Sequence, residues 1–392
     1  MKKKVSKNVF WLGLVSCFND IASEMAYPII PLFLTNVLGA PVSIVGIIEG
    51  IAEATASILK SYFGWLSDAF GRRKPFTVIG YSVSTLSKLL LALSFSWPFV
   101  LVARFFDRFG KGIRTPARDA LICESSDKSD RGIAFGFHRA LDSLGAVIGP
   151  LFAFVAMSLL SGKYRLTFLL SFIPAVIGVL LLIFFVEEKK KTVPSFCSVK
   201  ANYAKLNMEY YFFLVISLLF SIGNSSDAFL ILRAQNLGLS ASLVVLAYMI
   251  FNISYSLFST PIGFLSDKIG HKNTLILSFA LFSFIYYFFG FANSVFYVWI
   301  LFPLYGIFMS LNEGISKAYI STLIENEYSG TGLGIFYTST GIFTLFSSII
   351  AGLLWSFYGP SSPFYFGSIT ALLSCFLLLF FPKFLIKTRN FS

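Results

Sequence analysis

The chain has 392 residues, of which 56% are hydrophobic and only 13% charged, and its mean hydropathy is +0.77. A water-soluble protein of this size carries about twice that share of charged residues, so the composition excludes an ordinary soluble enzyme or binding module. The formal net charge of +12 lies in short polar segments between apolar runs, which argues against nucleic acid as a partner.

About twelve apolar runs of roughly 20 residues alternate with short polar turns, a pattern typical of a helical protein that crosses the membrane many times. Lysine and arginine gather before the first run, after the second, in the central segment and at the C-terminal end, whereas the alternate turns are almost uncharged. By the positive-inside rule, both termini are expected in the cytoplasm, in a bacterial inner membrane.

The first predicted span covers residues 8–36 and carries two acids near mid-membrane. Asp20 and Glu24 lie one helical turn apart, on one face. A carboxylate at this depth costs several kcal/mol unless it faces a cavity or a partner. Pro28 and Pro31 are expected to kink the outer part of the span.

The second and third predicted spans, residues 42–70 and 75–94, also hold charges at depth. Glu49 and Glu53 share a stripe with Lys60, and Lys88 lies in the third span. Such groups are predicted to line an interior rather than face lipid. For Glu49 and Glu53 two interpretations stand side by side, namely proton coupling and neutralisation of lysines or arginines within a packed bundle.

A repeated hairpin pattern marks the end of the second span. Residues 64–75 read GWLSDAFGRRKP, and the pattern returns 199 positions later in residues 263–272 as GFLSDKIGHK. An apolar helix that turns on a glycine into basic residues predicts a helix-loop-helix hairpin at a membrane face. The second copy has His271 and Lys272 in place of Arg72 and Arg73, so its charge interactions are expected to be weaker.

The fourth predicted span, residues 97–123, is the most charged. Asp107, Lys111, Arg114 and Arg118 recur at helical spacing and are expected to form one polar stripe, with Arg104 and Arg108 as a neighbouring pair.

The fifth span places His138 and Asp142 one turn apart, followed by Gly145 and Gly149, which permit close helix packing. His138 is expected to be a satisfied interior group, so no metal site and no cofactor are predicted. The four cysteines lack paired spacing, which indicates neither a disulfide framework nor a zinc site. No phosphate-binding Walker A pattern is present, so the chain is not expected to hydrolyse ATP.

The polar segment 188–207 is expected to be a cytoplasmic linker between two halves, residues 1–187 and 208–392. The second half repeats the plan with fewer charges. Asp227 lies in the seventh span and Glu313 and Lys317 in the tenth, and the last two fall 199 positions after Arg114 and Arg118. Such correspondence is expected of duplicated halves.

The repeated hairpin pattern resembles the loop between the second and third helices of the major facilitator superfamily. The run of residues 104–114, RFFDRFGKGIR, resembles the family's fourth-helix motif, with Arg104 matching its arginine, and residues 145–150 resemble the fifth-helix motif often associated with exporters. The resemblance implies an all-α integral membrane fold of about twelve transmembrane helices in two pseudo-symmetric six-helix bundles. It also implies a secondary transporter rather than an enzyme, acting as a monomer by alternating access.

The resemblance further implies roles for individual residues. A conformational latch that does not touch substrate is expected from Gly64, Asp68, Gly71, Arg72, Arg73, Arg104 and Asp267. The family's first, fourth, seventh and tenth helices line a central cavity, and here they carry the expected substrate-binding residues Asp20, Glu24, Arg108, Arg114, Asp227, Glu313 and Lys317. Proton coupling is expected from Asp20, Glu24, Glu49 and Glu53.

A cavity with both signs of charge suits a solute that carries its own separated charges. We therefore expect proton-coupled transport of a polar anionic or zwitterionic small solute, such as an amino-acid-like metal chelate or a siderophore. The expected partners are this solute, protons and membrane lipid. The first alternative is a proton antiporter of lipophilic drugs, which the fifth-helix motif favours and the charges disfavour. Further alternatives are a membrane-embedded enzyme acting on lipids and a receptor that does not transport.

Overall fold

A computed structural model describes residues 5–127, 130–160, 162–188, 206–324 and 329–389. Every regular element in these ranges is helical, which confirms the expected all-α fold. Most of the expected linker 188–207, including residues 189–205, lies outside the described residues.

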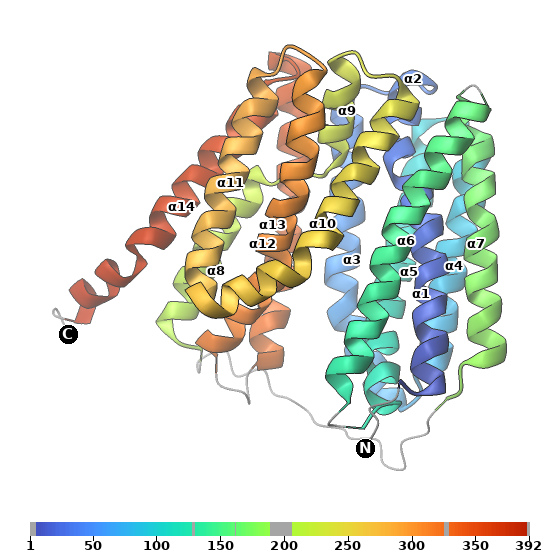
Figure 1. Cartoon of the computed structure of the whole chain (residues 1–392), viewed down its shortest axis with the longest axis horizontal. Helices are drawn as coiled ribbons and strands as arrows, with labels where there is room; N and C mark the ends of the chain where they lie inside the picture. The colour runs from blue at the N-terminus through green and yellow to red at the C-terminus, as the bar shows by residue number, and fades with distance from the viewer. Residues whose placement is uncertain (1–4, 128–129, 161, 189–205, 325–328, 390–392) are drawn as a thin grey trace. The chain divides into compact units, whose positions relative to one another are not determined.

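The helices follow one another along the chain, most of them long and a few of them short (Figure 1). In order they are α1 (Lys7–Ala26), η1 (Tyr27–Ile29), α2 (Ile30–Asn36), α3 (Val42–Phe70), α4 (Lys74–Ala92), α5 (Trp97–Glu124), α6 (Arg131–Leu159), α7 (Tyr164–Phe185), α8 (Met208–Gly223), α9 (Ala228–Asn236), α10 (Ala241–Ile269), α11 (His271–Phe291), α12 (Phe296–Leu323), α13 (Ser329–Tyr358) and α14 (Ser362–Arg389).

Ten segments of the described chain are long and apolar enough to cross a membrane, counting α8 and α9 together as one. Two predicted spans are not among the ten. They are the first span, which consists of α1 and α2, and the fourth span, which is α5. The first is divided at the 3-10 turn and carries Asp20 and Glu24, and α5 carries charged residues along its length, which lowers their hydropathy. Together with the ten, they give the expected set of about twelve membrane helices, and the chain is an integral membrane protein.

Local sequence explains where several spans begin, break and end. Ser6 caps α1 by accepting a hydrogen bond from the Val9 amide at 3.3 Å. The expected kink of the first span is confirmed, because the helix passes through a 3-10 turn, Tyr27–Ile29, that contains Pro28. The helix α3 ends at Gly71, whose φ of 62° is in the left-handed region that glycine adopts readily.

The seventh span is interrupted as well. The helix α8 ends at Gly223 and α9 begins at Ala228, so four residues without helical structure lie within the span. Interrupted helices in corresponding positions of two halves are typical of secondary transporters, whose solute sites lie near such breaks.

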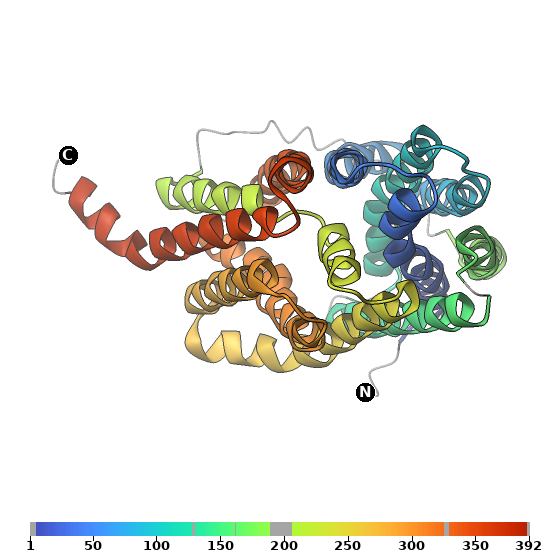
Figure 2. The same cartoon turned by 90° about the horizontal axis from the view of Figure 1, so that it is seen from above.

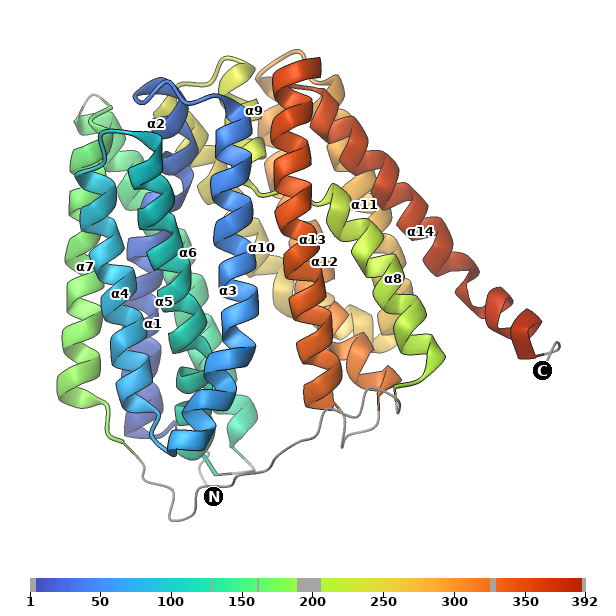
Figure 3. The same cartoon turned by 180° about the vertical axis from the view of Figure 1, so that it is seen from behind.

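The chain divides into two compact units, residues 1–198 with 239–249 and residues 199–238 with 250–392. In the first unit, α1 packs on α6 and α7, α5 packs on α3 and α4, and α4 packs on α7 (Figures 2 and 3). In the second unit, α11 packs on α12 and α14, and α8 packs on α13 and α14. The half boundaries expected at residues 187 and 208 remain a prediction.

Glycines set the closest helix contacts of the first unit. A Cβ atom on Gly110 of α5 would lie 2.5 Å from Ser84 Oγ and 2.9 Å from the Ser84 backbone nitrogen on α4. On α6, a Cβ atom on Gly145 would lie 2.6 Å from the Cys17 carbonyl oxygen, and Gly149 is equally tight. The glycine pattern of the fifth span therefore seats α6 directly against α1.

We expect Gly110→Ala to lower the free energy of unfolding by about 1–3 kcal/mol, because the added methyl group overlaps the α4 backbone. Gly136→Ala is the matched control, since no heavy atom lies within 4 Å of its added Cβ and alanine favours helix. Thermal unfolding of both variants in detergent tests the prediction. Equal melting temperatures for the two variants would contradict the close α4–α5 contact.

Candidate functional site

Two acid–arginine pairs connect α3 to α5. Arg104 donates from Nε and Nη2 to the two carboxylate oxygens of Glu49, at 2.9 and 2.5 Å. One turn along both helices, Arg108 Nη2 lies 2.8 Å from Glu53 Oε1. Arg104 and Arg108 of α5 thus each contact an acid on a neighbouring helix. Both carboxylates have the arginine partners that the structural interpretation requires.

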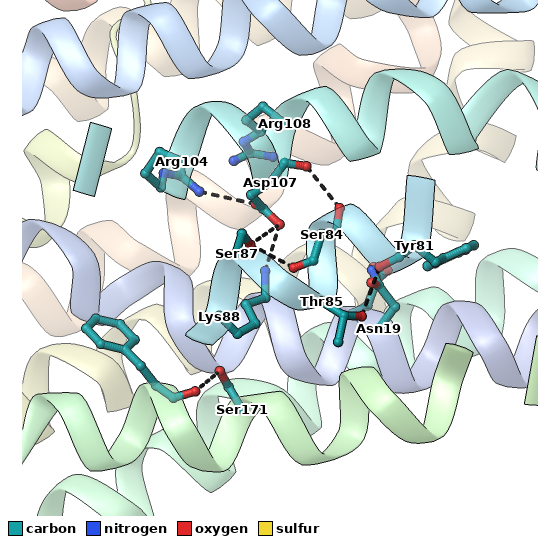
Figure 4. A network of polar contacts seen from close by, with 12 residues as sticks. Asn19, Tyr81, Ser84, Thr85, Ser87, Lys88, Arg104, Asp107, Arg108 and Ser171 are labelled. Atoms are coloured by element: carbon teal, nitrogen blue, oxygen red, sulfur yellow. Dashed lines mark hydrogen bonds and ion pairs between the residues drawn. The ribbon is translucent and has the colours of Figure 1, made fainter. Parts of the chain in front are cut away.

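A third ion pair links α5 to α4. Lys88 Nζ lies 2.7 Å from Asp107 Oδ1, and both side chains are more than nine-tenths buried. Ser87 donates to the same carboxylate at 3.4 Å, and Arg104 Nη1 lies 3.6 Å from Asp107 Oδ2. Figure 4 shows Asp107 between these α4 side chains and Arg104. Lys88 therefore pairs with Asp107, whereas Glu49 and Glu53 pair with arginines.

The expected polar stripe of α5 faces two different neighbours. Arg114 is 5% exposed, donates to Ser84 Oγ at 2.6 Å and lies over the Tyr81 ring of α4, with 4.6 Å from its guanidinium carbon to the ring centroid. Arg118 instead donates to Ser16 Oγ of α1 at 2.9 Å. A substrate contact of Arg114 stays a prediction.

Asp20 and Glu24 differ from the other membrane acids of the first unit. Among the described residues, neither has a cation within 4 Å of its carboxylate. Both side chains are half-buried, and Lys111 of α5 is close enough to act on both electrostatically. Glu24 accepts a hydrogen bond of 3.0 Å from Tyr248, which belongs to the same unit. These acids can gain or lose a proton without leaving a paired arginine behind.

The α6 glycines hold these two acids in place. A Cβ atom on Gly145 would lie 3.0 Å from the Asp20 Cβ, and one on Gly149 would lie 2.9 Å from the Glu24 Cβ. The spacing of the glycines thus matches the spacing of the acids on α1. Substitution at either glycine would move α1 and its carboxylates.

His138 and Asp142 lie one turn apart on α6 and face each other. The Nδ1 atom of His138 lies 3.5 Å from Asp142 Oδ2. Within the described chain, His138 Nε2 and Asp142 Oδ1 have no hydrogen-bond partner. The expectation that His138 is fully satisfied is therefore wrong for one of its two ring nitrogens. The described residues contain no group of three or more metal-binding side chains.

The first hairpin is held by Arg73 rather than by Arg72. Arg73 is 4% exposed; it pairs with Asp68, donates to Ser67 Oγ at 2.8 Å, and lies 3.4 Å from Glu124 at the end of α5. Arg72 is exposed and takes no part in these contacts. Gly64 faces Pro116 of α5, because a Cβ atom added to Gly64 would lie 3.4 Å from the proline Cβ. Arg73 and Gly64 thus connect the first hairpin and α3 to α5 within one unit, and the latch role of these residues stays a prediction.

Glu188, just beyond α7, closes the hairpin from the other side. Its carboxylate accepts hydrogen bonds from the backbone nitrogens of Arg73 at 2.9 Å and Lys74 at 2.8 Å. A carboxylate at a helix N-terminus is stabilising because it satisfies free amides and opposes the helix dipole. Sequence reasoning missed both Glu188 and Glu124, since their partners lie 115 and 51 positions away.

We expect Glu188→Gln to speed hydrogen exchange at the amides of Arg73 and Lys74 by about tenfold, because a charged acceptor contributes about 1.5–3 kcal/mol to such a bond. Glu187→Gln is the matched control, as Glu187 contributes its backbone nitrogen, donating to Asn8 at 2.9 Å. Exchange measured peptide by peptide tests this. Equal protection of the hairpin in the two variants would contradict the cap.

The second hairpin has weaker charge contacts, as expected. His271 Nδ1 lies 2.8 Å from Ser266 Oγ, and Gly270 makes the turn with a φ of 87°. Asp267 is exposed, and in the described part of the chain no ion pair reaches it. The first hairpin therefore makes more ion pairs than the second hairpin does among the described residues.

The expected site acids of the second unit face tyrosines. Asp227, just before α9, accepts a hydrogen bond of 2.7 Å from the Tyr305 hydroxyl of α12. Glu313 of α12 accepts one from Tyr255. Lys317 Nζ lies 5.7 Å from the centroid of the Tyr337 ring. The acids and the lysine thus lie at the break of the seventh span and on the tenth span, and each of them is next to a tyrosine.

A sequence model of the Major Facilitator Superfamily matches residues 12–226 and 211–389. The chain is 38% identical over 386 residues to the Uncharacterized MFS-type transporter MJ1317 of Methanocaldococcus jannaschii, covering 96% of both chains. It is 26% identical over 195 residues to the Bacillibactin exporter of Bacillus subtilis, covering 48% of each. It is 22% identical over 146 residues to the Quinolone resistance protein NorA of Staphylococcus aureus, covering 37% of each.

Solved transporter structures share the fold. A POT family transporter in complex with 5-aminolevulinic acid superposes with a TM-score of 0.80 at 14% identity, covering 96% of both chains. The nucleoside transporter NupG gives 0.76 at 12% identity, covering 95% of this chain and 98% of NupG. The human organic anion transporter MFSD10 gives 0.67 at 15% identity, covering 95% and 99%.

Proposed function

Because the chain belongs to the major facilitator superfamily and is a membrane transporter rather than an enzyme, we propose that it couples proton movement to transport of a polar small solute. In this proposal the solute is anionic or zwitterionic, and a metal chelate or siderophore is a member of that class. The two halves, residues 1–187 and 208–392, alternate access to the solute across a prokaryotic plasma membrane such as the bacterial inner membrane. Both termini are cytoplasmic and the transporter works as a monomer.

We assign proton coupling from the burial of Asp20 and Glu24 and from their missing arginine partners among the described residues. They are half-buried acids at mid-span without an arginine partner in the described chain, whereas Glu49 and Glu53 each have one. An ionisable residue inside a membrane span is a functional candidate because its burial is costly. We therefore assign proton binding to Asp20 and Glu24 ahead of Glu49 and Glu53.

The charge of the solute follows from the cations beside these acids. Lys111 makes no ion pair in the described ranges and is close enough to act on Asp20 and Glu24, and Arg108 is near Glu24 as well. A solute carboxylate or phosphonate could bind Lys111 while a solute ammonium group binds a deprotonated acid. The relative named as a bacillibactin exporter supports transport of a small molecule.

The experiment is thermal stabilisation of the purified protein by 5-aminolevulinic acid, citrate, a ferric catecholate and tetraphenylphosphonium, at two pH values. A ligand present at 100 times its Kd adds about 2.7 kcal/mol to the stability of the folded state. We expect a rise in melting temperature with at least one anionic or zwitterionic compound, and dependence of that rise on pH.

The second candidate function is export of lipophilic compounds by proton antiport. The fifth-span glycines and the relative named as a quinolone resistance protein favour it. Stabilisation by tetraphenylphosphonium alone would select this function and contradict the polar solute. Stabilisation by an anionic or zwitterionic compound alone would exclude it.

A further inference from the structure

A groove of about 660 Å³ opens at the end of α4 that carries the first hairpin, between α4 and α7. Its floor and walls are apolar, formed by Pro75, Val78, Ile79 and Ile183. Ile79 is 53% exposed and Ile183 is 41% exposed, so the apolar surface is open. In a membrane protein, such a surface along two spans faces acyl chains.

The rim of this groove is basic. Arg72 and Lys74 line it, and so does Glu188. The Glu188 carboxylate is already engaged by the backbone nitrogens of Arg73 and Lys74. Lys74 Nζ donates one hydrogen bond to the Ile183 carbonyl oxygen at 2.8 Å and keeps two further donors.

The exposed guanidinium of Arg72 also points to a ligand. It is exposed, and in the described chain no hydrogen bond or ion pair engages its guanidinium, because Arg73 alone pairs with Asp68. An arginine offers a planar fork of donors that matches phosphate geometry. Arginine and lysine above an apolar wall complement an anionic head group above an acyl chain.

We propose that this groove is a binding site for one anionic phospholipid, whose phosphate contacts Arg72 and Lys74 and whose acyl chain lies along Val78, Ile79 and Ile183. Basic pockets between membrane helices on the cytoplasmic side are suited to such head groups. The segment that follows Glu188 begins with three lysines, which carry the same charge as Arg72 and Lys74 on the rim. Because like charges repel, this segment is not the occupant that we propose. Bound lipid would join the hairpin to the end of α7.

The test is native mass spectrometry of the purified full chain with phosphatidylglycerol, cardiolipin and phosphatidylcholine of matched acyl chains. We expect at least about tenfold stronger retention of one anionic lipid than of phosphatidylcholine. The double variant Arg72→Gln/Lys74→Gln should lose this preference. Lys7→Gln/Lys268→Gln is the matched control, since both lysines are exposed and lie outside the groove, and it should keep the preference.

A second variant separates the acyl-chain site from general charge attraction. Ile79→Trp fills the groove at an exposed position while leaving both cations, and it should also reduce anionic-lipid retention. Equal retention of phosphatidylglycerol and phosphatidylcholine by the wild type would overturn the proposal, as would unchanged preference in Arg72→Gln/Lys74→Gln or in Ile79→Trp. Displacement of the lipid by millimolar glycerol 3-phosphate would assign the rim to a free phosphate instead. None of these outcomes depends on solute or proton transport.

Discussion

Replacing Arg104 with Met should lower the free energy of unfolding by about 3–5 kcal/mol, because it leaves a buried carboxylate without its partner. Glu49 is 0% exposed, and both of its carboxylate oxygens accept hydrogen bonds from the Arg104 guanidinium. The double variant Glu49→Leu/Arg104→Met should recover most of the loss, since an apolar pair can replace a buried ion pair. A denaturant titration of the wild type, the two single variants and the double variant measures the coupling.

The neighbouring pair is the control for this prediction. Glu53 has a side chain that is 35% exposed, so it can be hydrated when Arg108 is lost. Arg108→Met should therefore cost less than Arg104→Met. Equal costs at the two positions, or no recovery in the double variant, would mean that burial does not set the energy of these pairs.

Neutralising the two acids of α1 should remove proton-driven accumulation. Asp20→Asn with Glu24→Gln keeps the side-chain shapes but cannot carry a proton between two sides of the membrane. With a pH difference of one unit, a coupled transporter accumulates solute about tenfold for each proton moved. We expect the variant to accumulate none, and to exchange labelled for unlabelled solute more weakly than the wild type, because amides replace the carboxylates that bind a solute ammonium group.

The assay uses proteoliposomes and the compound that stabilises the protein most strongly. Asp119→Asn is a useful comparison, because Asp119 is 44% exposed and already paired with Arg118. It should retain accumulation. Undiminished accumulation in Asp20→Asn/Glu24→Gln would remove these acids from the coupling step.

Much of the fold could be predicted because apolar runs and turn residues act locally. The sequence predicts the second span at residues 42–70 and α3 is Val42–Phe70, with Gly71 ending the helix as the motif requires. The break after Ala26 follows from Pro28. The interruption of the seventh span between α8 and α9 is not predicted, since residues 224–227 contain neither glycine nor proline.

The sequence predicts which polar residues share a face of α5, but not which side chains they pair with, and the roles of the candidate site residues stay predictions. Helical spacing places Asp107 and Arg114 on one stripe of α5. It could not predict that Asp107 pairs with Lys88 of α4, or that Arg114 donates to Ser84 of α4. Periodicity fixes the face of a helix, whereas the partner depends on which helix packs there. The same limit hid Glu188, whose hairpin contacts span more than a hundred positions.

The most direct test of proton-coupled transport is the internal pH of proteoliposomes that contain the wild-type protein and a trapped pH-sensitive dye. A compound selected by thermal stabilisation is added on one side, with no pH gradient imposed and the membrane potential clamped. We predict a change of internal pH that requires the compound and is absent from Asp20→Asn/Glu24→Gln vesicles. Solute entry without any change of internal pH would contradict proton coupling.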